Sequence, residues 1–433
     1  MGDAATYREL GEAAWAWTLG QVRHGADGPW LPATVTGEDQ EPGKFRDSFY
    51  EGIAGLAPVL AELRRHRPWT PAETALADAI VERLSTTDRD EPSLYDGLAG
   101  DATALRLLAP GREVAVLARL AQLSTPGGWE TTLRQDSRDP ASDVVMGSAG
   151  IMLLAAWAGG PHAAEIMTTG GEALLKVAEP TDGGLDWRMW PGYRSSSPNF
   201  SHGTAGVGAA LAVAGQALGR ADFVDAARRG AAHLLAVADL AGGGFVVPHT
   251  SPPSQREVEP VTYTWCHGPA GTSQLFPALA LAGVSDVGGF PVGELRRRCL
   301  HSLLTCGLPA RLRPGFWDND GRCCGTAGVG DILLDAAQDD PSDEALLTGA
   351  RVMAEALVER AIRDGDGAYW RFVEHRQDPP LLPPGTSWMQ GAAGIAAFLL
   401  RMARVSQEGL TAPVVDRPDQ WWAVPAEVRS RRP

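Results

Sequence analysis

The chain has 433 residues, 44% of them hydrophobic, and a formal net charge of −15 at pH 7. This acidic balance argues against a nucleic-acid-binding protein, because contacts with phosphate groups need a basic surface. No apolar run reaches the roughly 18 residues that a membrane-spanning helix needs, so we expect no transmembrane segment. The five cysteines, an odd number, follow an N-terminus without a secretion signal and indicate a reducing compartment, which we take to be the cytoplasm.

The first element that we expect is a helix in the N-terminal segment, residues 1–44, ahead of a repeat that fills most of the chain. The motif Gly-x-Ala-Gly occurs seven times, at steps of 45 to 66 residues. With 51 glycines in the chain, Gly-x-x-Gly alone would occur about six times by chance, and the alanine lowers this expectation to about one. The copies begin at Gly52, Gly97, Gly147, Gly203, Gly268, Gly325 and Gly391. The sequence therefore contains an internal repeat, with its core at residues 45–400.

Each motif precedes an apolar stretch of roughly 10 to 14 residues, which is typical of a helix buried on all sides. Between these stretches lie segments with a single apolar face, which predict outer helices at residues 72–84, 114–123, 221–238 and 343–362. One inner and one outer helix per repeat predict an all-α fold, an α/α toroid (a double helical barrel) of seven helix pairs. We expect one domain over residues 1–433, with a C-terminal tail at residues 411–433, and no β-sheet.

The residue directly before each motif has a special place in such a fold. The two glycines let the loop turn sharply and let the inner helix start close to its neighbours. The preceding residue should then point toward the ring axis at one end. These residues are Glu51, Asp96, Met146, His202, His267, Cys324 and Gln390. Histidine and cysteine come from repeats four to six, so we expect the chemistry there.

Two cysteine motifs occupy the same place in adjacent repeats: Trp-Cys-His-Gly at residues 265–268 and Arg-Cys-Cys-Gly at residues 322–325. Because adjacent repeats are neighbours in space, Cys266, Cys323 and Cys324 should converge. Three soft ligands without an obvious fourth are typical of a catalytic zinc site with an open position. Vicinal cysteines can also be small buried hydrophobic residues, but their common register in two repeats favours a metal.

His202 holds the corresponding place in the repeat before, within the sequence Ser-His-Gly-Thr-Ala-Gly. An isolated histidine would more often be structural, but its register with the thiols makes it a candidate catalytic residue. Asp143, one repeat further back, could orient His202 and raise its pKa, or could simply cap its loop. Cys299 and His301 fall outside the register and are expected to pack in a helix.

Together these motifs resemble the lanthionine synthetase C-like cyclases, and the likeness covers residues 45–400. The resemblance implies an α/α toroid of seven helical pairs with zinc at one end of the central funnel. It also implies an enzyme that closes thioether rings in a peptide, by adding a cysteine thiol to dehydroalanine or dehydrobutyrine. The chain has no kinase-like or dehydratase segment, so separate dehydratase, kinase or lyase proteins would have to dehydrate the precursor peptide.

Residue by residue, the resemblance implies that Cys266, Cys323 and Cys324 bind the zinc ion. His202 matches the motif histidine, a candidate acid or base, and Asp143 matches the upstream acidic residue. A zinc-bound thiol would be a thiolate at neutral pH and hence a nucleophile. The enolate left after its addition needs a proton, which His202 could supply.

Two positions depart from the family pattern. Cyclases of this type usually carry arginine four residues before the first zinc cysteine, where this chain has Thr262. They usually carry tyrosine directly after that cysteine, where this chain has His267. We expect His267 to be a catalytic residue that replaces the tyrosine as proton donor, and Arg322 or Arg256 to supply the missing cation.

Three other interpretations stay open at this point. An α/α-toroid prenyltransferase would use aspartate, cysteine and histidine as zinc ligands. An α/α-toroid glycosidase would need two carboxylates in its cavity, for which Glu51 and Asp96 are available. A non-catalytic scaffold that binds a peptide or a partner enzyme would explain the missing arginine and tyrosine, but it would not need an open zinc site.

Overall fold

The computed structural model describes residues 3–36, 40–86, 88–131, 139–253, 260–310, 319–375 and 377–420. The chain divides into two compact units, each assembled from separate segments. Unit 1 comprises Met1–Asp88, Ala104–Arg112 and Cys306–Val415, and unit 2 comprises Arg89–Thr103, Glu113–Thr305 and Asp416–Pro433. The single domain expected over residues 1–433 stays a prediction.

Every Gly-x-Ala-Gly motif begins a buried inner helix. These helices are η1 with α2 (Ile53–Leu56 and Ala57–His66), α4 (Leu98–Leu108), α6 (Ser148–Ala158), α8 (Thr204–Leu218), α10 with α11 (Pro269–Thr272 and Leu275–Leu281), α13 (Thr326–Asp339) and α15 (Ala392–Glu408). All residues of α8 from Thr204 to Gly215 are buried. Helices covered on all sides in this way need apolar or small residues at almost every position, which explains the apolar stretches in the sequence.

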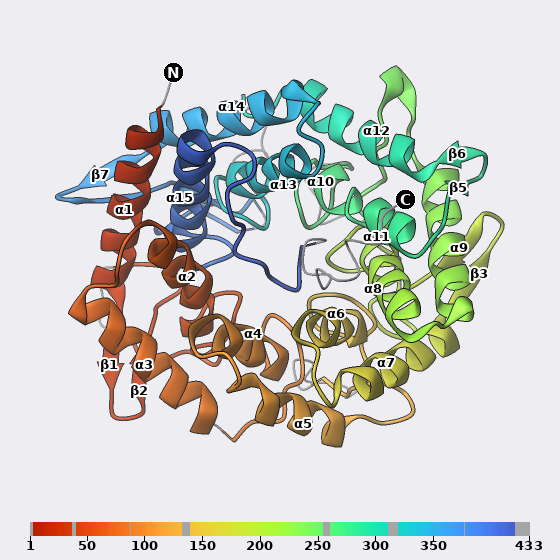
Figure 1. Ribbon diagram of the computed structural model, residues 1–433, viewed down its shortest axis with the longest axis horizontal. Coiled ribbons are helices and arrows are strands. Elements are labelled where there is room, and N and C mark those ends of the chain that lie inside the picture. Colours follow the sequence, from red (N-terminus) through yellow and green to blue (C-terminus); the bar gives the residue numbers. More distant parts are fainter. Residues whose placement is uncertain are drawn as a thin grey trace. The chain divides into compact units, whose positions relative to one another are not determined.

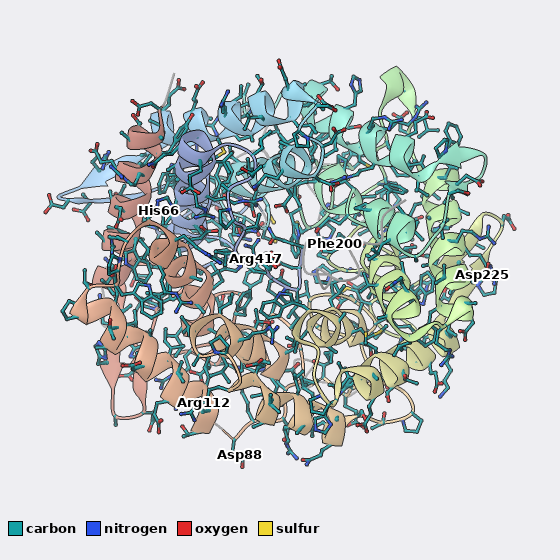
Figure 2. All side chains as sticks on the ribbon, in the orientation of Figure 1. His66, Asp88, Arg112, Phe200, Asp225 and Arg417 are labelled. Atoms are coloured by element: carbon teal, nitrogen blue, oxygen red, sulfur yellow. The ribbon has the colours of Figure 1, made fainter. Side chains whose placement is uncertain are left out.

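The outer helices bury a single face. They are α3 (Pro71–Thr86), α5 (Glu113–Leu123), α7 (Ala163–Val177), α9 (Ala221–Val237), α12 (Val292–Thr305) and α14 (Glu344–Arg360). In α9 the buried residues Phe223, Ala226, Ala227, Gly230, Ala231 and Leu234 recur every three or four positions, the spacing of one helix face. Within unit 2, Figure 1 shows α7 and α9 alongside α6 and α8. Asp225 on α9 lies at the outer edge of the side-chain view in Figure 2.

The seventh outer helix comes from the other end of the chain. Helix α1 (Ala4–Gln21) packs along α15, the inner helix of the last repeat (Figure 1). A Cβ atom on Gly11 of α1 would lie 2.9 Å from Leu400 Cγ of α15. This close approach means that the N-terminal helix completes the last helix pair. Seven pairs are therefore present, with repeats six, seven and one in unit 1.

Strands form only short antiparallel pairs in the described ranges, so the expectation of no β-sheet is confirmed apart from these hairpins. The pairs are β1–β2 (Arg23–Gly25, Gly28–Trp30), β3–β4 (Glu179–Thr181, Gly184–Asp186), β5–β6 (Asp286–Val287, Phe290–Pro291), β7–β8 (Ile362–Asp364, Gly367–Tyr369) and β9–β10 (Phe372–Val373, Leu381–Leu382). A tryptophan after two of these hairpins anchors the preceding outer helix. Trp187 Nε1 donates to Leu174 O, and Trp370 Nε1 donates to Leu357 O, each at 2.8 Å.

Close packing explains the two glycines of each motif. The first glycine has a negative φ, for example −120° at Gly147, so it is not needed for a left-handed turn. A Cβ atom there would instead lie closer than 3.0 Å to backbone atoms about six residues earlier, as at Gly147 and Gly268. At the last glycine, the added atom would also meet a side chain of the preceding repeat: Val144 at Gly206 and Phe200 at Gly271. The sharp-turn explanation is thus replaced by one of space.

Backbone hydrogen bonds tie the loops of successive repeats together. We call the residue two before the first glycine the link position: Tyr50, Tyr95, Val145, Ser201, Cys266, Cys323 and Met389. In unit 2, the link N–H donates to the next repeat's link carbonyl from Tyr95 to Val145 (3.3 Å), from Val145 to Ser201 (3.3 Å) and from Ser201 to Cys266 (3.1 Å). In unit 1, Cys323 donates to Met389 (2.9 Å) and Met389 to Tyr50 (3.1 Å). The last repeat is thereby joined to the first.

Buried charges interrupt the apolar inner helices of unit 1. Asp331 and Asp335 on α13 are 3% and 2% exposed. Arg401 on α15 pairs with both, at 2.8 and 2.6 Å, and Arg404 pairs with Glu62. Such charges are tolerated because each has a partner, and removing one partner would leave an uncompensated buried charge.

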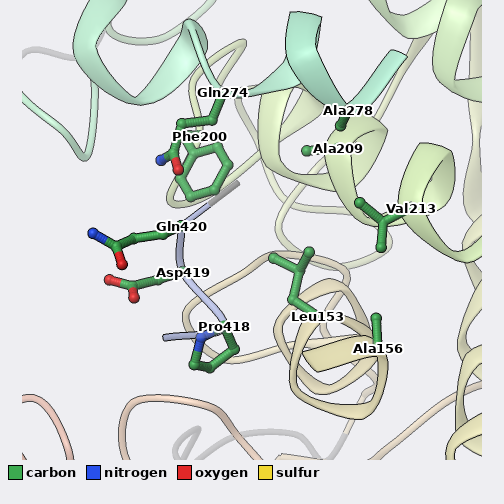
Figure 3. A pocket seen from close by; sticks show the side chains of 10 residues that line it. All are labelled: Leu153, Ala156, Phe200, Ala209, Val213, Gln274, Ala278, Pro418, Asp419 and Gln420. Carbon is green, nitrogen blue, oxygen red and sulfur yellow. The ribbon is translucent and has the colours of Figure 1, made fainter. Parts of the chain in front are cut away.

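The C-terminal segment enters the interior of unit 2. Arg417, Asp419 and Gln420 are at most 5% exposed, and Tyr95 Oη donates to Asp419 Oδ2 at 3.1 Å. Figure 3 shows Pro418, Asp419 and Gln420 beside side chains of α6, α8 and α11, such as Leu153, Val213 and Ala278. Within the predicted tail, residues 417–420 are therefore buried in unit 2, whereas Thr411 and Pro413 are exposed; residues 421–433 lie outside the described residues. In the described chain, no helix is long and apolar enough to cross a bilayer.

We expect Gly206→Ala to destabilise the protein. Its Cβ would press on the carbonyl oxygen of Phe200 and on Val144, and overpacking of this kind costs about 1–3 kcal/mol. Gly20→Ala is the matched control, because nothing lies within 4 Å of a Cβ atom there and alanine is favoured over glycine in a helix. Urea unfolding measures both. Equal stability of the two variants would contradict the packing explanation.

Candidate functional site

The residue directly before each motif is less buried than its neighbours in most repeats. We call its place in the repeat the cavity position. In five repeats its residue is partly exposed between two buried neighbours: Asp96, Met146, His202, His267 and Gln390. Because the link residue beside it is held by backbone hydrogen bonds, the next side chain in the loop is turned out of the packed layer. The orientation toward a ring axis that the repeat predicts for these residues stays a prediction.

Asp143 and His202 lie together in unit 2. His202 Nδ1 is 2.6 Å from Asp143 Oδ2, and the Asp143 side chain is fully buried while 24% of the His202 side chain is exposed. The other carboxylate oxygen of Asp143 accepts the backbone N–H of Met146 at 2.7 Å. Asp143 therefore both caps its loop and orients His202, so the two roles weighed from the sequence occur in one side chain.

The surroundings of His202 favour its charged form. Burial alone would lower the pKa of His202, but the hydrogen bond and negative charge of Asp143 outweigh it, with smaller contributions from Cys266 and Asp96. The pKa is thus raised above its ordinary value. With Nδ1 held by Asp143, the Nε2–H of the imidazolium is left to act as a proton donor.

Cys266 lies in the loop next to that of His202. Its carbonyl oxygen accepts the N–H and the Oγ–H of Ser201, at 3.1 and 2.9 Å. Its sulfur lies 3.3 Å from Thr264 Oγ1, and the residue is 2% exposed. Cys266 is therefore a buried thiol in a rigid loop, with a hydroxyl group against its sulfur.

The other two candidate ligands lie together in unit 1. Cys323 and Cys324 are each 6% exposed, and their sulfur atoms are 3.4 Å apart. Gln390 Nε2, from the cavity position of the next repeat, lies 3.8 Å from Cys324 Sγ and donates to Tyr50 Oη at 3.0 Å. Cys323 occupies the link position, as Cys266 does in its own repeat, so equivalent backbone geometry holds these two thiols.

Cys299 and His301 lie on α12, away from the loops. Cys299 is fully buried, and burial raises the pKa of its thiol. His301 is exposed and lies 3.1 Å from Gly242 O through Nε2. Cys299 therefore packs inside its helix layer, as the sequence predicts, whereas the prediction is wrong for His301, whose side chain is exposed. Cys306, also outside the register, is half-buried, and burial raises the pKa of its thiol to about 11.

His249 is a residue of the site that sequence reasoning did not find. It is 3% exposed, and its ring centroid lies 3.8 Å from that of His267. Its carbonyl oxygen accepts Asn199 Nδ2 at 2.8 Å, which ties its loop to the loop of His202. The His267 ring in turn lies 5.6 Å from the His202 ring. No sequence motif includes His249, and the segment between His249 and the Trp-Cys-His-Gly motif has none of its own.

His267 differs electrostatically from His202. Burial lowers the pKa of His267 to about 4; Cys266 partly opposes this effect, and His249 adds to it. The neutral ring can still donate one N–H or accept one proton. The two histidines therefore differ in protonation: Asp143 favours the charged form of His202, whereas burial favours the neutral form of His267.

Comparison with known proteins places the chain in a family. A family model described as lanthionine synthetase C-like protein matches residues 43–410. The chain belongs to the lanthionine synthetase C-like family. Among solved structures, nisin cyclase is similar with a TM-score of 0.57 and 18% identity, over 84% of this chain and 89% of that chain. This likeness confirms the all-α fold of the α/α-toroid class.

A second solved structure, a GH76 α-mannanase of Bacteroides thetaiotaomicron, is 11% identical over 93% of this chain and 96% of its own. Its TM-score of 0.46 is too low to support an argument. No curated protein matches the sequence significantly.

This LanC-like chain departs from its relatives' pattern at Thr262. The threonine is fully buried, and its Oγ1 donates to His267 O at 3.0 Å. Arg322, one proposed source of the missing cation, pairs with Asp331 at 2.8 Å and lies over the Trp388 ring at 4.2 Å. Its guanidinium is therefore engaged within unit 1, at 6% exposure. Arg256, the other proposed source, lies outside the described residues.

Asp143→Asn should lower the pKa of His202, because the amide keeps the shape of the carboxylate and removes its charge. NMR titration of the His202 ring, with both proteins in the same metal state, measures the change. A raised folded-state pKa stabilises the fold fully below the unfolded-state pKa, and this stability is lost as the pH rises through the folded-state value. The variant should therefore lose stability mainly on the acidic side of neutrality. An unchanged His202 titration would refute the pairing.

Proposed function

We propose that this chain is a zinc-dependent lanthionine synthetase that acts as a stand-alone cyclase. Its substrate would be a dehydrated precursor peptide, in which cysteine thiolates add to dehydroalanine or dehydrobutyrine to form thioether rings. The observation that carries the proposal is the occurrence of Cys266 and Cys323 at the equivalent link positions of two repeats, with Cys324 directly after Cys323 in the chain. Family membership and the likeness to nisin cyclase support it.

The residues fit a zinc ion. Cys266, Cys323 and Cys324 are all buried and are candidates for the ligands of one metal ion. Two thiolates bound at the usual Zn–S distance of about 2.3 Å in tetrahedral geometry would lie about 3.8 Å apart. The 3.4 Å between the sulfurs of Cys323 and Cys324 is near this value. Three protein thiolates would leave a fourth position for the substrate sulfur.

The chain's own residues would then manage the protons. Zinc at this site would lower the pKa of the substrate thiol, so that it reacts as a thiolate. The sulfur forms a bond to the β-carbon, and the alkene electrons move to the α-carbon and its carbonyl as an enolate. His202, held as an imidazolium by Asp143, would donate its proton to the α-carbon. The reaction neither oxidises nor reduces the peptide, so no further cofactor is needed.

His267 would take the part of the family's tyrosine. Its ring contacts the tilted ring of His249, with the centroids 3.8 Å apart, and Thr262 Oγ1 donates to its backbone carbonyl oxygen. A neutral imidazole in this place can donate a hydrogen bond to the developing enolate oxygen, as a tyrosine hydroxyl would. We therefore assign His267 to the reaction as a hydrogen-bond donor.

The proposal has consequences for partners and compartment. The precursor would be dehydrated by separate dehydratase, kinase or lyase proteins, and no nucleic acid takes part. None of the five cysteines forms a disulfide within the described residues, which suits a reducing cytoplasm. The core and tail would form one domain, so thermal unfolding should be a single transition.

A non-catalytic scaffold is the second candidate, and Thr262 is the observation that favours it. Without the arginine, the site holds one cation fewer for an enolate. A scaffold that binds peptide would need no charged His202, however, and Asp143 is fully buried beside it. We therefore prefer the cyclase.

Purified protein should contain one zinc ion per chain, measured by elemental analysis. The double variant Cys323→Ala and Cys324→Ala should lose it, because two of three protein ligands are gone. Cys299→Ala and Cys306→Ala are the matched controls and should keep the metal. Full zinc occupancy in the double variant would show that the ligands were assigned wrongly.

Incubation with a dehydrated precursor should consume the peptide's thiols, counted with a thiol reagent. His202→Asn should retain zinc and fold but cyclise on the order of 10² times more slowly, typical of losing a general acid. Asp143→Asn should be milder and move the pH optimum toward acid, since the pKa of His202 falls. A zinc-loaded wild-type protein that consumes no thiols would favour the scaffold.

A further inference from the structure

A cavity in unit 1 opens beside the first Gly-x-Ala-Gly motif. It has a volume of about 170 Å³, room for about five water molecules at roughly 30 Å³ each, or for one long side chain. Trp30 and Phe45 provide aromatic surface, while Glu41 and Glu51 contribute carboxylates. The cavity is thus built for a single group with an apolar stem and a polar end.

Glu51 is the most informative residue of this cavity. It occupies the cavity position of repeat one, and its backbone N–H donates to Ser48 Oγ at 3.0 Å, which fixes the loop. Among the described residues its carboxylate has neither a hydrogen bond nor an ion pair. Burial raises the pKa of Glu51, as expected for a carboxylate that has lost water without gaining a partner.

Two cations lie near this cavity, Lys44 and Arg46. Lys44 Nζ lies 5.3 Å from the Phe45 ring centroid. Arg46 lines the cavity, and its Nη2 donates to the carbonyl oxygens of Gly28 and Pro29, both at 3.2 Å. Two carboxylates and one guanidinium group therefore occur among the lining residues, which gives the lining an acidic balance of one charge.

The cavity lies on the same line of loops as the candidate thiols of unit 1. The link hydrogen bonds run from Cys323 to Met389 and from Met389 to Tyr50. Gln390 spans the same loops by its side chain, between Cys324 Sγ and Tyr50 Oη. Glu51 follows Tyr50 directly. Glu51 thus occupies the same position in repeat one that Gln390 occupies in repeat seven and Cys324 in repeat six.

We infer that this cavity is a subsite for a basic side chain of the peptide substrate, with Glu51 as the carboxylate that binds its ammonium or guanidinium group. This assignment rests on the proposed function, in which the substrate is a peptide, and adds that the peptide carries a basic side chain. The aromatic surface of Trp30 and Phe45 would cover the apolar stem. Binding would give Glu51 the partner that it lacks within the described chain.

The test uses the full-length zinc-loaded protein and two short peptides, acetyl-Ala-Ala-Lys-Ala-Ala-amide and the same peptide with norleucine in place of lysine. Titration is followed by the NMR signal of the Trp30 indole N–H, which lines the cavity. The lysine peptide should bind with a dissociation constant in the millimolar range and about fivefold more tightly than the norleucine peptide, or about 1 kcal/mol.

Glu51→Gln should reduce lysine-peptide affinity to that of the norleucine peptide, because the amide keeps the shape and loses the charge. Glu408→Gln, at an exposed end of α15, is the matched control and should bind like the parent. Equal affinity of the wild-type protein for both peptides, unchanged binding in Glu51→Gln, or no shift at Trp30 would each overturn the assignment.

The peptides contain neither cysteine nor dehydroamino acid, so their binding does not depend on cyclisation. A protein that binds lysine through Glu51 but closes no rings would retain this subsite and lose the proposed function. In an active protein, replacing the precursor's lysines by norleucine should raise KM about fivefold, the same 1 kcal/mol, and leave kcat unchanged. A change in kcat alone would contradict a binding role.

Discussion

The hydrogen bonds between link positions are the interaction on which the rest of this structure depends. Each contributes only about 0.5–1.5 kcal/mol net, but together they set the register of every loop. A shift of one residue would exchange Cys266 with His267 and Ser201 with His202, and would turn the reactive groups into the packed layer. The glycines protect this register, because any Cβ atom at Gly147 or Gly268 would collide with the loop backbone.

Much of the helical fold could be predicted from the sequence, because every repeat contains the same Gly-x-Ala-Gly motif. The outer helix expected at residues 72–84 is Pro71–Thr86, and the one at 221–238 is Ala221–Val237. The pairing of α1 with α15 could not be predicted, because a local sequence pattern does not indicate which helix, almost 400 residues away, will pack against α1. His249 could not be predicted for a related reason. It belongs to the candidate site through the contact of its ring with the His267 ring, and such a contact produces no regular spacing in the sequence.

The buried ion pairs between α13 and α15 could, in contrast, be predicted from the spacing of charged residues in the sequence. Asp331 and Asp335 are four residues apart on one helix face, and Arg401 and Arg404 are three apart on the other helix. Opposite charges at helical spacing in two otherwise apolar stretches predict buried pairs. These pairs matter for the site because Arg322 joins them through Asp331. Arg322, directly before two candidate ligands, is thereby held in the buried ion pairs of unit 1.

The pairing of α1 with α15 also has a consequence for how the chain folds during synthesis. Helix α1 leaves the ribosome almost 400 residues before α15, so its buried face, with Tyr7, Trp15 and Trp17, is not covered by α15 during that interval. Contacts between residues so far apart in sequence form late and slowly. A nascent chain would therefore expose this aromatic face until α15 has been synthesised, and exposed surface of this kind favours chaperone binding or aggregation.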